Sequence, residues 1–581
     1  MSGNLLALSV GPVQEFISAA RRTRDLWFGS YLLSEISKAA AKAVKAHGKL
    51  IFPAPLDDAQ LDRDSFNVAN IILAKLSQFE PEQVAHAAKA AAQQRWRGFA
   101  RSVLTRYQDV IRQRIWEEQI DDVIEFYAAW HPYAPESYSQ DRAALMRLLA
   151  ARKLCRDFVP AKGHAGIPKS SLDGLRESVL LKERLYGHRR PLRLSEGEEL
   201  DVVGLVKRTW GPEGQVVHYP SVARVAADPW LRGAEQHLSQ LKQACAELAG
   251  RRILNRLDVS PGGHPHYALF PFEGTAVFRS RHPEFIKETE IKDQDLNPLR
   301  AALTELIGQY GEPSPYLAVL VADGDRMGQA LSRLDLPNQH RNFSRALASF
   351  ASNARDIVNA HSGVMVYAGG DDVLAFLPVD RCLGCARALH DAFGDALAGK
   401  TAKGAPTPTL SVGLAIAHFM EPLEDLLDYG RQAEKHAKHP HPEDGQQGDR
   451  DGLAVHVVKR GRGPVGFRAN WSENPDQHLA RLAGWMRSAA ISGRVAYDLR
   501  KLAEVYDAWT DRASLRDAIQ RDALLLMAGK RTAGTAQIDA INELIRERVT
   551  DAGALRTLVN ELLIARQIGA AMRQAEPNSR N

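Results

Sequence analysis

The feature that most constrains the fold is an acidic turn between two strand-like runs. Residues 363–377 contain two apolar runs rich in β-branched and aromatic side chains, which favour strands. The runs meet at Gly369, Gly370, Asp371 and Asp372. Paired glycines adopt the positive φ angles that tight hairpin turns require. The sequence therefore predicts a β-hairpin that carries two adjacent carboxylates at its tip.

Two adjacent carboxylates repel each other, so we expect a cation beside them. A divalent metal ion suits this position, because hard cations such as Mg²⁺ prefer carboxylate oxygens. The glycines would also let a phosphate group come close, because they have no side chain. A solvated turn without a function is the simpler alternative, and the four residues alone do not exclude it.

The elements around this turn repeat an earlier part of the chain. Each copy reads strand, helix, strand, strand, helix, strand, which is the ferredoxin-like order. The second copy is expected to have a strand at 316–322, a helix at 343–357, the hairpin, a helix at 381–397, a strand at 409–416 and a closing helix at 423–437. The first copy is expected to have a strand at 5–10, a helix at 13–47, strands at 50–52 and 70–73, a helix from residue 81 and a strand at 123–130.

The first copy lacks the acidic residues of the second. Gly11-Pro12 stands where the second copy has Asp323-Gly324, and the first copy has no Gly-Gly-Asp-Asp sequence. We therefore expect an inactive first unit and one active site in the second unit.

The length of the chain predicts several domains. A chain of 581 residues is too long for one hydrophobic core and should form about three to five domains. We expect an α+β multidomain fold in which the linker domain contains one helix from Trp230 to Arg252. The expected parts are an inactive ferredoxin-like unit at 1–150, an irregular segment at 151–225, a helical and mixed linker domain at 226–312, an active ferredoxin-like unit at 313–470 and a C-terminal helical bundle at 471–581.

Composition limits the compartment and the partners. No apolar run is long enough to span a membrane, and no signal-peptide core follows the first residues, so we expect a cytoplasmic protein without a membrane partner. Four cysteines argue against a disulfide framework. The pair Cys382 and Cys385 falls on an expected helix, which favours buried thiols over zinc ligands.

A net charge of +5 permits a polyanionic partner but does not require one. Arg21, Arg22 and Arg24 could hold an RNA backbone or a partner subunit, or could be a solvated helix face.

The first strand of a ferredoxin-like unit lies beside its hairpin. Asp323, at the end of the strand at 316–322, should therefore approach Asp371 and Asp372. Three converging carboxylates could hold two Mg²⁺ or Mn²⁺ ions about 4 Å apart, an arrangement that serves nucleotidyl transfer from a triphosphate. Asp325 ranks below these three, because strand alternation turns it to the same side only if the strand continues.

Further residues could bind the nucleotide. Those that could meet or admit its phosphates are Arg431, Lys435 and Lys438 on the closing helix, and the glycines Gly324, Gly369 and Gly370. For the three basic residues, an exposed helix end without a ligand is an equal alternative.

Four segments resemble one known family. They are SVGPVQEFISAARRTRDLWFGSYLLSEI (9–36), KSSLDGLRESVL (169–180), YLAVLVADGDRMGQAL (316–331) and YAGGDDVLAFLP (367–378). Together they resemble the large, polymerase-like subunit of type III-B (Cmr) CRISPR-Cas effector complexes. The resemblance implies that both ferredoxin-like units are palm domains, and that Asp323, Asp371 and Asp372 occupy the metal positions of that family.

The resemblance also implies an activity and partners. The second palm would join ATP molecules into cyclic oligoadenylate in antiviral defence, once a guide RNA (crRNA) has paired with a target RNA. The partners would be the other Cmr subunits, the guide RNA, the target RNA and ATP, and the cofactor Mg²⁺ or Mn²⁺.

The sequence departs from that family in two places. Many members begin with an HD nuclease domain, whereas this sequence starts at the first palm-like unit, and its His390-Asp391 pair falls on the helix after the hairpin. We therefore expect no HD-type DNase activity. Members commonly carry a cysteine-bound zinc after the first unit, and only Cys155 with His164 nearby remains here, which argues against a structural zinc.

Two other functions remain open at this point. A stand-alone nucleotide cyclase of the GGDEF type would share the acidic hairpin, but it would not explain the inactive first copy or the helical C-terminus. A catalytically silent scaffold subunit would bind RNA and its neighbours only. The retained acids at Asp323 and in the hairpin argue against the scaffold.

Overall fold

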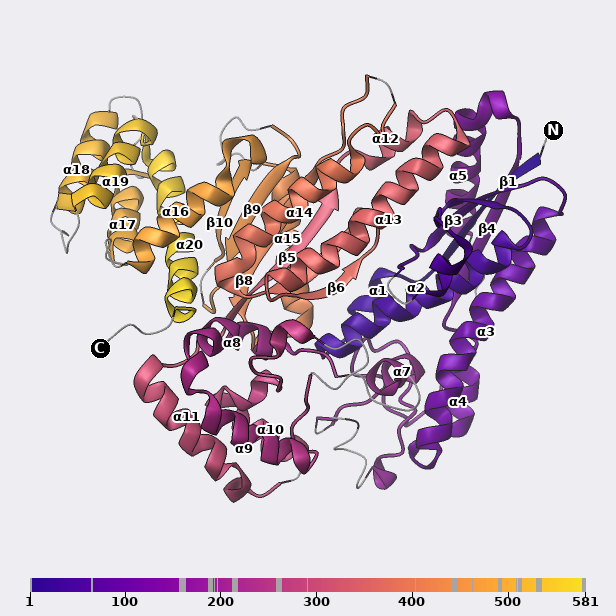
Figure 1. Cartoon of the computed structure of the whole chain (residues 1–581), viewed down its shortest axis with the longest axis horizontal. Helices are drawn as coiled ribbons and strands as arrows, with labels where there is room; N and C mark the ends of the chain where they lie inside the picture. The colour runs from indigo at the N-terminus through magenta and orange to yellow at the C-terminus, as the bar shows by residue number, and fades with distance from the viewer. Residues whose placement is uncertain are drawn as a thin grey trace.

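The computed structural model shows two mixed α/β units joined by a helical domain and followed by a helical bundle (Figure 1). The residues that it describes are 3–63, 66–155, 163–185, 192, 194–195, 197–211, 218–257, 264–289, 291–402, 404–440, 448–461, 463–488, 494–507, 509, 515–528 and 535–576. The α+β multidomain class predicted from the sequence is confirmed.

The first unit is built on a four-stranded antiparallel sheet in the order β2-β3-β1-β4, which is the ferredoxin-like order. Its strands are β1 (Gly3–Gly11), β2 (Lys49–Phe52), β3 (Ile71–Leu76) and β4 (Glu125–Tyr133). Its helices are α1 (Gln14–Ser18), α2 (Thr23–Lys45), α3 (Pro81–Tyr107), α4 (Gln113–Ile120) and α5 (Tyr138–Leu154). Helices α2 and α3 cover one face of the sheet and α5 the other.

The prediction of one helix over 13–47 is wrong, because the chain bends between α1 and α2. The ammonium of Lys207 donates to the carbonyls of Phe16 and Ala19, the second at 2.9 Å, and so satisfies carbonyls at the end of α1. Arg22 then takes an extended conformation, with φ of −123° and ψ of 145°, before α2 begins.

The second unit has a six-stranded sheet in the order β10-β9-β8-β5-β7-β6. Its strands are β5 (Tyr316–Gly324), β6 (Val364–Ala368), β7 (Val373–Leu377), β8 (Leu410–His418), β9 (Gly452–Val457) and β10 (Val465–Asn470). The four strands β8-β5-β7-β6 again form the ferredoxin-like order. β9 pairs in parallel with β8, and β10 pairs antiparallel with β9. The sequence analysis did not predict these last two strands.

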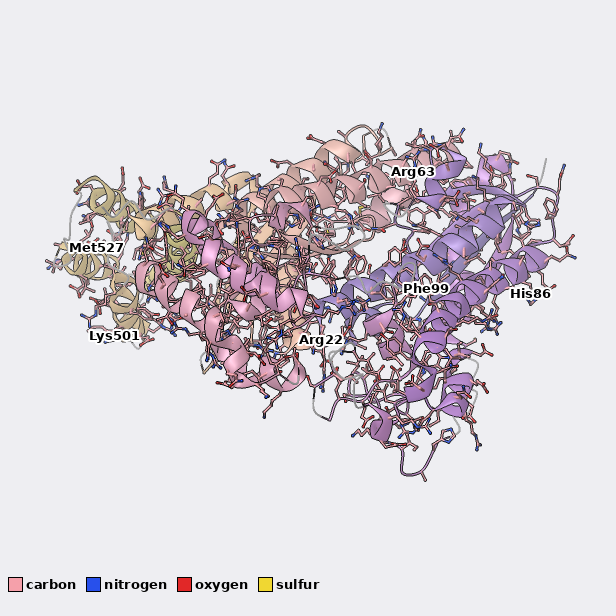
Figure 2. All side chains as sticks on the ribbon, turned by 60° about the horizontal axis from the view of Figure 1, so that its bottom comes forward. Arg22, Arg63, His86, Phe99, Lys501 and Met527 are labelled. Carbon is pink, nitrogen blue, oxygen red and sulfur yellow. The ribbon has the colours of Figure 1, made fainter. Side chains whose placement is uncertain are left out.

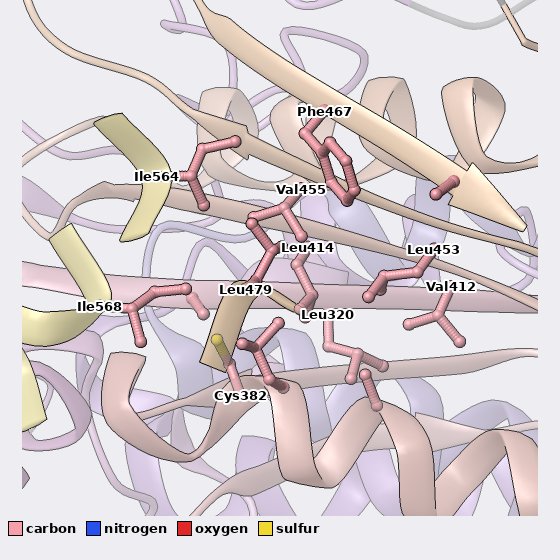
Figure 3. Packing of buried hydrophobic residues seen from close by; sticks show 14 of the residues in the cluster. Leu320, Cys382, Val412, Leu414, Leu453, Val455, Phe467, Leu479, Ile564 and Ile568 are labelled. Carbon is pink, nitrogen blue, oxygen red and sulfur yellow. The ribbon is translucent and has the colours of Figure 1, made fainter. Parts of the chain in front are cut away.

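Helices cover both faces of the second sheet. They are α12 (Met327–Ser332), α13 (Pro337–Ala360), α14 (Cys382–Leu397) and α15 (Leu423–Lys438). The C-terminal helices α16 (Pro475–Arg487) and α20 (Ala552–Gln574) share the sheet face that α13 and α14 cover. Figure 3 shows this shared core, in which Leu479 of α16 and Ile564 of α20 pack over Leu414 and Val455 of the sheet. The remaining bundle helices are α17 (Val495–Asp507), α18 (Arg516–Ala528) and α19 (Thr535–Arg548).

The linker domain lies against the opposite face of the second sheet. Its helices are α8 (Val222–Gly233), α9 (Ser239–Gly250), α10 (His282–Thr289) and α11 (Asn297–Tyr310). The single helix predicted from Trp230 to Arg252 is wrong, because α8 ends at Gly233 and α9 begins at Ser239. The backbone carbonyl of Gln574 lies where a side chain at Gly233 would stand, so α20 packs directly on the end of α8.

The segment predicted to be irregular contains one helix that the sequence analysis missed, α7 (Val202–Thr209). This helix is buried against α2 and α3. Residues 156–162, 186–191, 193, 196 and 212–217 of that segment lie outside the described residues. No helix in the described ranges combines the length and the apolar character needed to cross a bilayer.

Candidate metal-binding active site

Three aspartates meet where β5 ends and the hairpin turns. β5 pairs with β7 so that Ala322 lies opposite Val373, which places Asp323 beside the turn that precedes β7. Asp323, Asp371 and Asp372 each have a carboxylate oxygen within 4.8 Å of the others. Among the described residues, these are the single group of three or more potential ligands that are this close together. The structure therefore brings together the three acids that the sequence analysis selected.

The turn itself has the form of a tight hairpin. Gly369 donates its N–H to the carbonyl of Asp372 at 2.9 Å, which closes the turn. Gly370 has a φ of 103°, a region that side chains make unfavourable. Asp371 follows at the tip, and Asp372 leads into β7.

Gly324 has a role in packing that the sequence analysis did not predict. A Cβ atom at this position would stand 2.8 Å from Cβ of Asp371, 2.9 Å from Cγ of Met327 and 3.0 Å from Cζ of Phe393. The absence of a side chain lets the end of β5 lie against the acidic turn. The sequence analysis assigned Gly324 to the approach of a phosphate, and that role stays a prediction.

The ionised form of these carboxyl groups is electrostatically unfavourable in this position. Burial and the neighbouring Asp372 raise the pKa of Asp371 to about 6. Burial also raises the pKa of Asp372. Close like charges and reduced solvation both disfavour the ionised form. A site of this kind gains from a cation that neutralises it.

Helix α15 supplies one cation to the site. Lys438 forms an ion pair with Asp323, and its Nζ also lies 2.9 Å from Oε1 of Glu434. Arg431 and Lys435 are exposed on the same helix, and neither makes an ion pair with a described residue. Of the three basic residues that the sequence analysis selected, the structure places only Lys438 in contact with the aspartates.

Glu434 is a further acid that the sequence analysis missed. Burial and the charges of Asp372 and Asp325 raise the pKa of Glu434 to about 7, so Glu434 lies close enough to Asp372 to feel its charge. Its spacing of four residues from Lys438 on a predicted helix was the available signal.

Asp325 is not part of the group of three aspartates, and its carboxylate lies in a buried polar network. Its carboxylate accepts hydrogen bonds from the hydroxyls of Thr409 (2.8 Å) and Ser411 (2.9 Å) and from the N–H of Asp451 (3.0 Å). It therefore ties the end of β5 to β8 and β9. This placement agrees with its lower rank in the sequence analysis.

The residues present fit a divalent metal ion. The donors are carboxylate oxygens alone, which suits Mg²⁺ or Mn²⁺ better than softer metals. Within the described part of the chain, the cysteines do not belong to a comparable set. Cys382 and Cys385 are buried in α14, Cys155 is exposed, and His164 contacts Glu118 at 2.6 Å.

Arg21, Arg22 and Arg24 make contacts within the chain. Arg24 is buried and donates to the carbonyls of Lys207 and Trp210. Arg22 lies 3.0 Å from Glu288 of α10, and Figure 2 places it where the first unit meets the linker domain. Arg21 donates to the carbonyl of Ser171 at 3.3 Å. These bonds join the first unit to the segments around it.

Substitution of Asp371 should stabilise the metal-free protein at alkaline pH. Because the folded-state pKa of Asp371 is raised to about 6, ionisation costs stability as the pH rises from about 4 through 6. Asp371→Asn should therefore raise the free energy of unfolding at pH 8, with EDTA present, by about 1–2 kcal/mol, and the gain should vanish near pH 4. Denaturant unfolding at the two pH values measures this. Asp356→Asn, on the exposed face of α13, is the control, and an equal response of the two variants would contradict the account.

Comparisons with known proteins identify both ferredoxin-like units. The model of the Cas10/Cmr2 second palm domain matches residues 316–453, and the model of the N-terminal region of the CRISPR-associated protein Cmr2 matches residues 5–101. The CRISPR system Cmr subunit Cmr2 of Pyrococcus furiosus is 30% identical over a segment that covers 29% of this chain and 22% of that protein. The alignment thus spans about a fifth of that relative.

Two solved structures show the same fold. A chain of the type III-B Cmr-beta structure in the apo state has a TM-score of 0.65 and 14% identity, and the match covers 92% of this chain and 78% of that one. A chain of the type III-B Cmr-beta bound to cognate target RNA has a TM-score of 0.61 and 13% identity, and the match covers 90% and 78% of the two chains.

Proposed function

Since the chain is a member of the Cas10/Cmr2 family, we propose that it makes cyclic oligoadenylate from ATP as a subunit of a type III-B CRISPR effector complex. The guide RNA, the target RNA and the other Cmr subunits are its proposed partners. Pairing of the target with the guide would switch the activity on, and the product would act in antiviral defence.

The observation that carries this proposal is the convergence of Asp323, Asp371 and Asp372 within 4.8 Å at the end of β5. All three belong to the segment that matches the second palm domain. β1 of the first unit ends at Gly11 without an aspartate, and among the described residues the group of three carboxylates is found in the second unit alone.

The proposed reaction is nucleotidyl transfer between ATP molecules. The 3′-hydroxyl of one ATP attacks the α-phosphorus of another, a phosphodiester forms, and pyrophosphate leaves with the bonding electrons. Divalent ions bound to the carboxylates would promote ionisation of the hydroxyl and neutralise phosphate charge. Asp323, Asp371 and Asp372 would hold those ions in a fixed arrangement.

The basic residues of α15 would orient the triphosphate. Lys438 already contacts Asp323, and Lys435 and Arg431 are exposed about one and two turns before it, respectively. Gly369 and Gly370 would leave room for phosphate oxygens beside the turn. These roles are predictions from position and charge.

The test uses the assembled complex with guide RNA and labelled ATP in Mg²⁺ or Mn²⁺. We expect oligoadenylate when complementary target RNA is added, and little or none without it. Chromatography with mass spectrometry separates linear from cyclic products. If target RNA yields no oligonucleotide, the chain acts as a scaffold, and if the isolated chain forms product without RNA, it acts as a stand-alone cyclase. Either result would overturn the proposal.

A further inference from the structure

The strand that leads to the acidic turn is held along its outer edge by side chains from distant parts of the chain. β6 is the edge strand of the second sheet and pairs only with β7. An edge strand leaves one row of backbone groups without a neighbouring strand. Carbonyls of β6 and the residues before it accept instead from four side chains: Tyr267 to Ser362 (2.9 Å), His266 to Gly363 (3.0 Å), Tyr219 to Met365, and Asn67 to Ala368 (3.3 Å).

The contact nearest to the turn comes from the first unit. The amide of Asn67 bonds to Ala368, three residues before Asp371. Phe66 and Val68, on either side of Asn67, are buried in the core of the first unit. The N–H of Val68 also donates to the hydroxyl oxygen of Ser34 in α2, at 2.9 Å. The first unit therefore fixes where the Asn67 amide stands.

The second contact is also tied to the first unit. The ring of Tyr219 stacks on Trp27 of α2 with 5.0 Å between centroids and 16° between planes. The hydroxyl of Thr23, in the same helix, donates to the carbonyl of Pro220 at 2.7 Å. α2 also packs directly against β6. Tyr219 thus reaches Met365 from a position that α2 holds.

The pairing of β6 with β7 is irregular close to the turn, where the side chains described above bind the strand. Met365 lies opposite Ala375 and Tyr367 opposite Leu374, so the register shifts between Met365 and Tyr367. The irregularity interrupts the ladder just before the residues that carry the acids. Asn67 bonds to the strand on the turn side of this irregularity, and Tyr219 bonds at its start.

We propose that Asn67 is a positioning residue for the acidic turn, supported by Tyr219, so that the first unit sets the place of the carboxylates in the second. This inference depends on the proposed function, because it treats the acidic turn as the catalytic element. Asn67 acts through the backbone of Ala368 and does not touch the reacting atoms. Through this bond, the unit that lacks the acidic turn takes part in the reaction of the other unit.

A series of substitutions that each remove one hydrogen bond tests the proposal in the assembled complex. The variants are Asn67→Ala, Tyr219→Phe and Tyr267→Phe, whose bonds lie progressively farther from Asp371 along the chain. Asn67→Gln keeps an amide donor and is the rescue variant. Ser139→Ala is the matched control, because Ser139 also joins the first unit to a carbonyl of the second, that of Ser332 at 3.0 Å, but away from β6.

We expect kcat for ATP to fall about tenfold in Asn67→Ala, about threefold in Tyr219→Phe and less than twofold in Tyr267→Phe, as loss of one hydrogen bond near the turn allows. KM should change less than twofold, and Asn67→Gln should recover most of the loss. Ser139→Ala should retain wild-type kcat. If these hydrogen bonds only stabilised the fold, the loss of kcat in each variant would follow its loss of thermal stability. Asn67→Ala and Ser139→Ala would then behave alike.

A second readout needs no turnover. Hydrogen exchange of the peptide 364–377 in the full chain should become at least about fivefold faster in Asn67→Ala and stay unchanged in Ser139→Ala. If the wild type makes no product but the exchange pattern holds, the proposed function fails while the positioning role stands. Unchanged exchange of this peptide in Asn67→Ala would overturn the positioning role, whatever the activity.

Discussion

Oligoadenylate formation should fall by at least about 1000-fold in the double variant Asp371→Asn plus Asp372→Asn, because loss of the metal-binding carboxylates removes several kcal/mol of transition-state stabilisation. Asparagine keeps the size of the side chain but removes the charge that a divalent ion requires. The measurement is the initial rate of product formation with target RNA and saturating Mn²⁺. The geometry predicts this loss, because both residues face Asp323 within 4.8 Å.

The double variant should still fold and assemble. Removing two crowded carboxylates relieves repulsion, so its thermal stability without metal should equal or exceed that of the wild type. Asp356→Asn, remote on α13, should retain full activity. Product formation at more than about a tenth of the wild-type rate in the double variant would place the chemistry elsewhere.

Gly324→Ala should lower the rate of product formation by about 10–100-fold, although it adds only one methyl group. That methyl group would stand 2.8 Å from Cβ of Asp371, closer than non-bonded carbons approach. Either β5 or the turn must then shift, which separates the carboxylates and costs about 1–3 kcal/mol of stability. The measurements are the rate with ATP and the midpoint of denaturant unfolding.

Gly328→Ala is the matched control for this variant. Gly328 is four residues away in α12, and a Cβ atom there would meet open space. Alanine in a helix should leave activity unchanged and should not lower stability. If Gly324→Ala kept full activity, the close approach of β5 to the turn would not be needed for function.

The sequence was most informative where pattern and chemistry agreed. The two apolar runs that flank Gly369 and Gly370 predicted the hairpin, and the apolar strand that leads to Asp323 predicted its neighbour in the sheet. The ferredoxin-like order of the elements then predicted that the three acids lie together. Glu434 and Asp325 needed the structure, because their roles depend on which side of α15 and β5 faces the turn.

The parts that sequence reasoning missed depend on contacts across long sequence separations. The break between α1 and α2 is stabilised by Lys207, which is far away along the chain. Local helix propensity does not reflect such a distant contact. β9 and β10 have only six residues each, which is too short for their periodicity to give a clear signal. Asn67 resembles any polar loop residue until Ala368 is found beside it.

Two units with similar folds thus have different proposed tasks. The second supplies the acids, and the first contributes α2, Asn67 and Tyr138 to the surface on which the second rests. Tyr138 and His340 share a buried hydrogen bond of 2.9 Å across this contact.

The most direct test of the central claim is the location of manganese in the protein with a non-hydrolysable ATP analogue. Anomalous diffraction at the manganese edge identifies the ion without assumptions about the ligands. The account predicts manganese bound to Asp323, Asp371 and Asp372 in the wild type, and its absence from the Asp371→Asn plus Asp372→Asn variant. Nucleotide bound with no manganese at these carboxylates, or with manganese held by other residues, would contradict it.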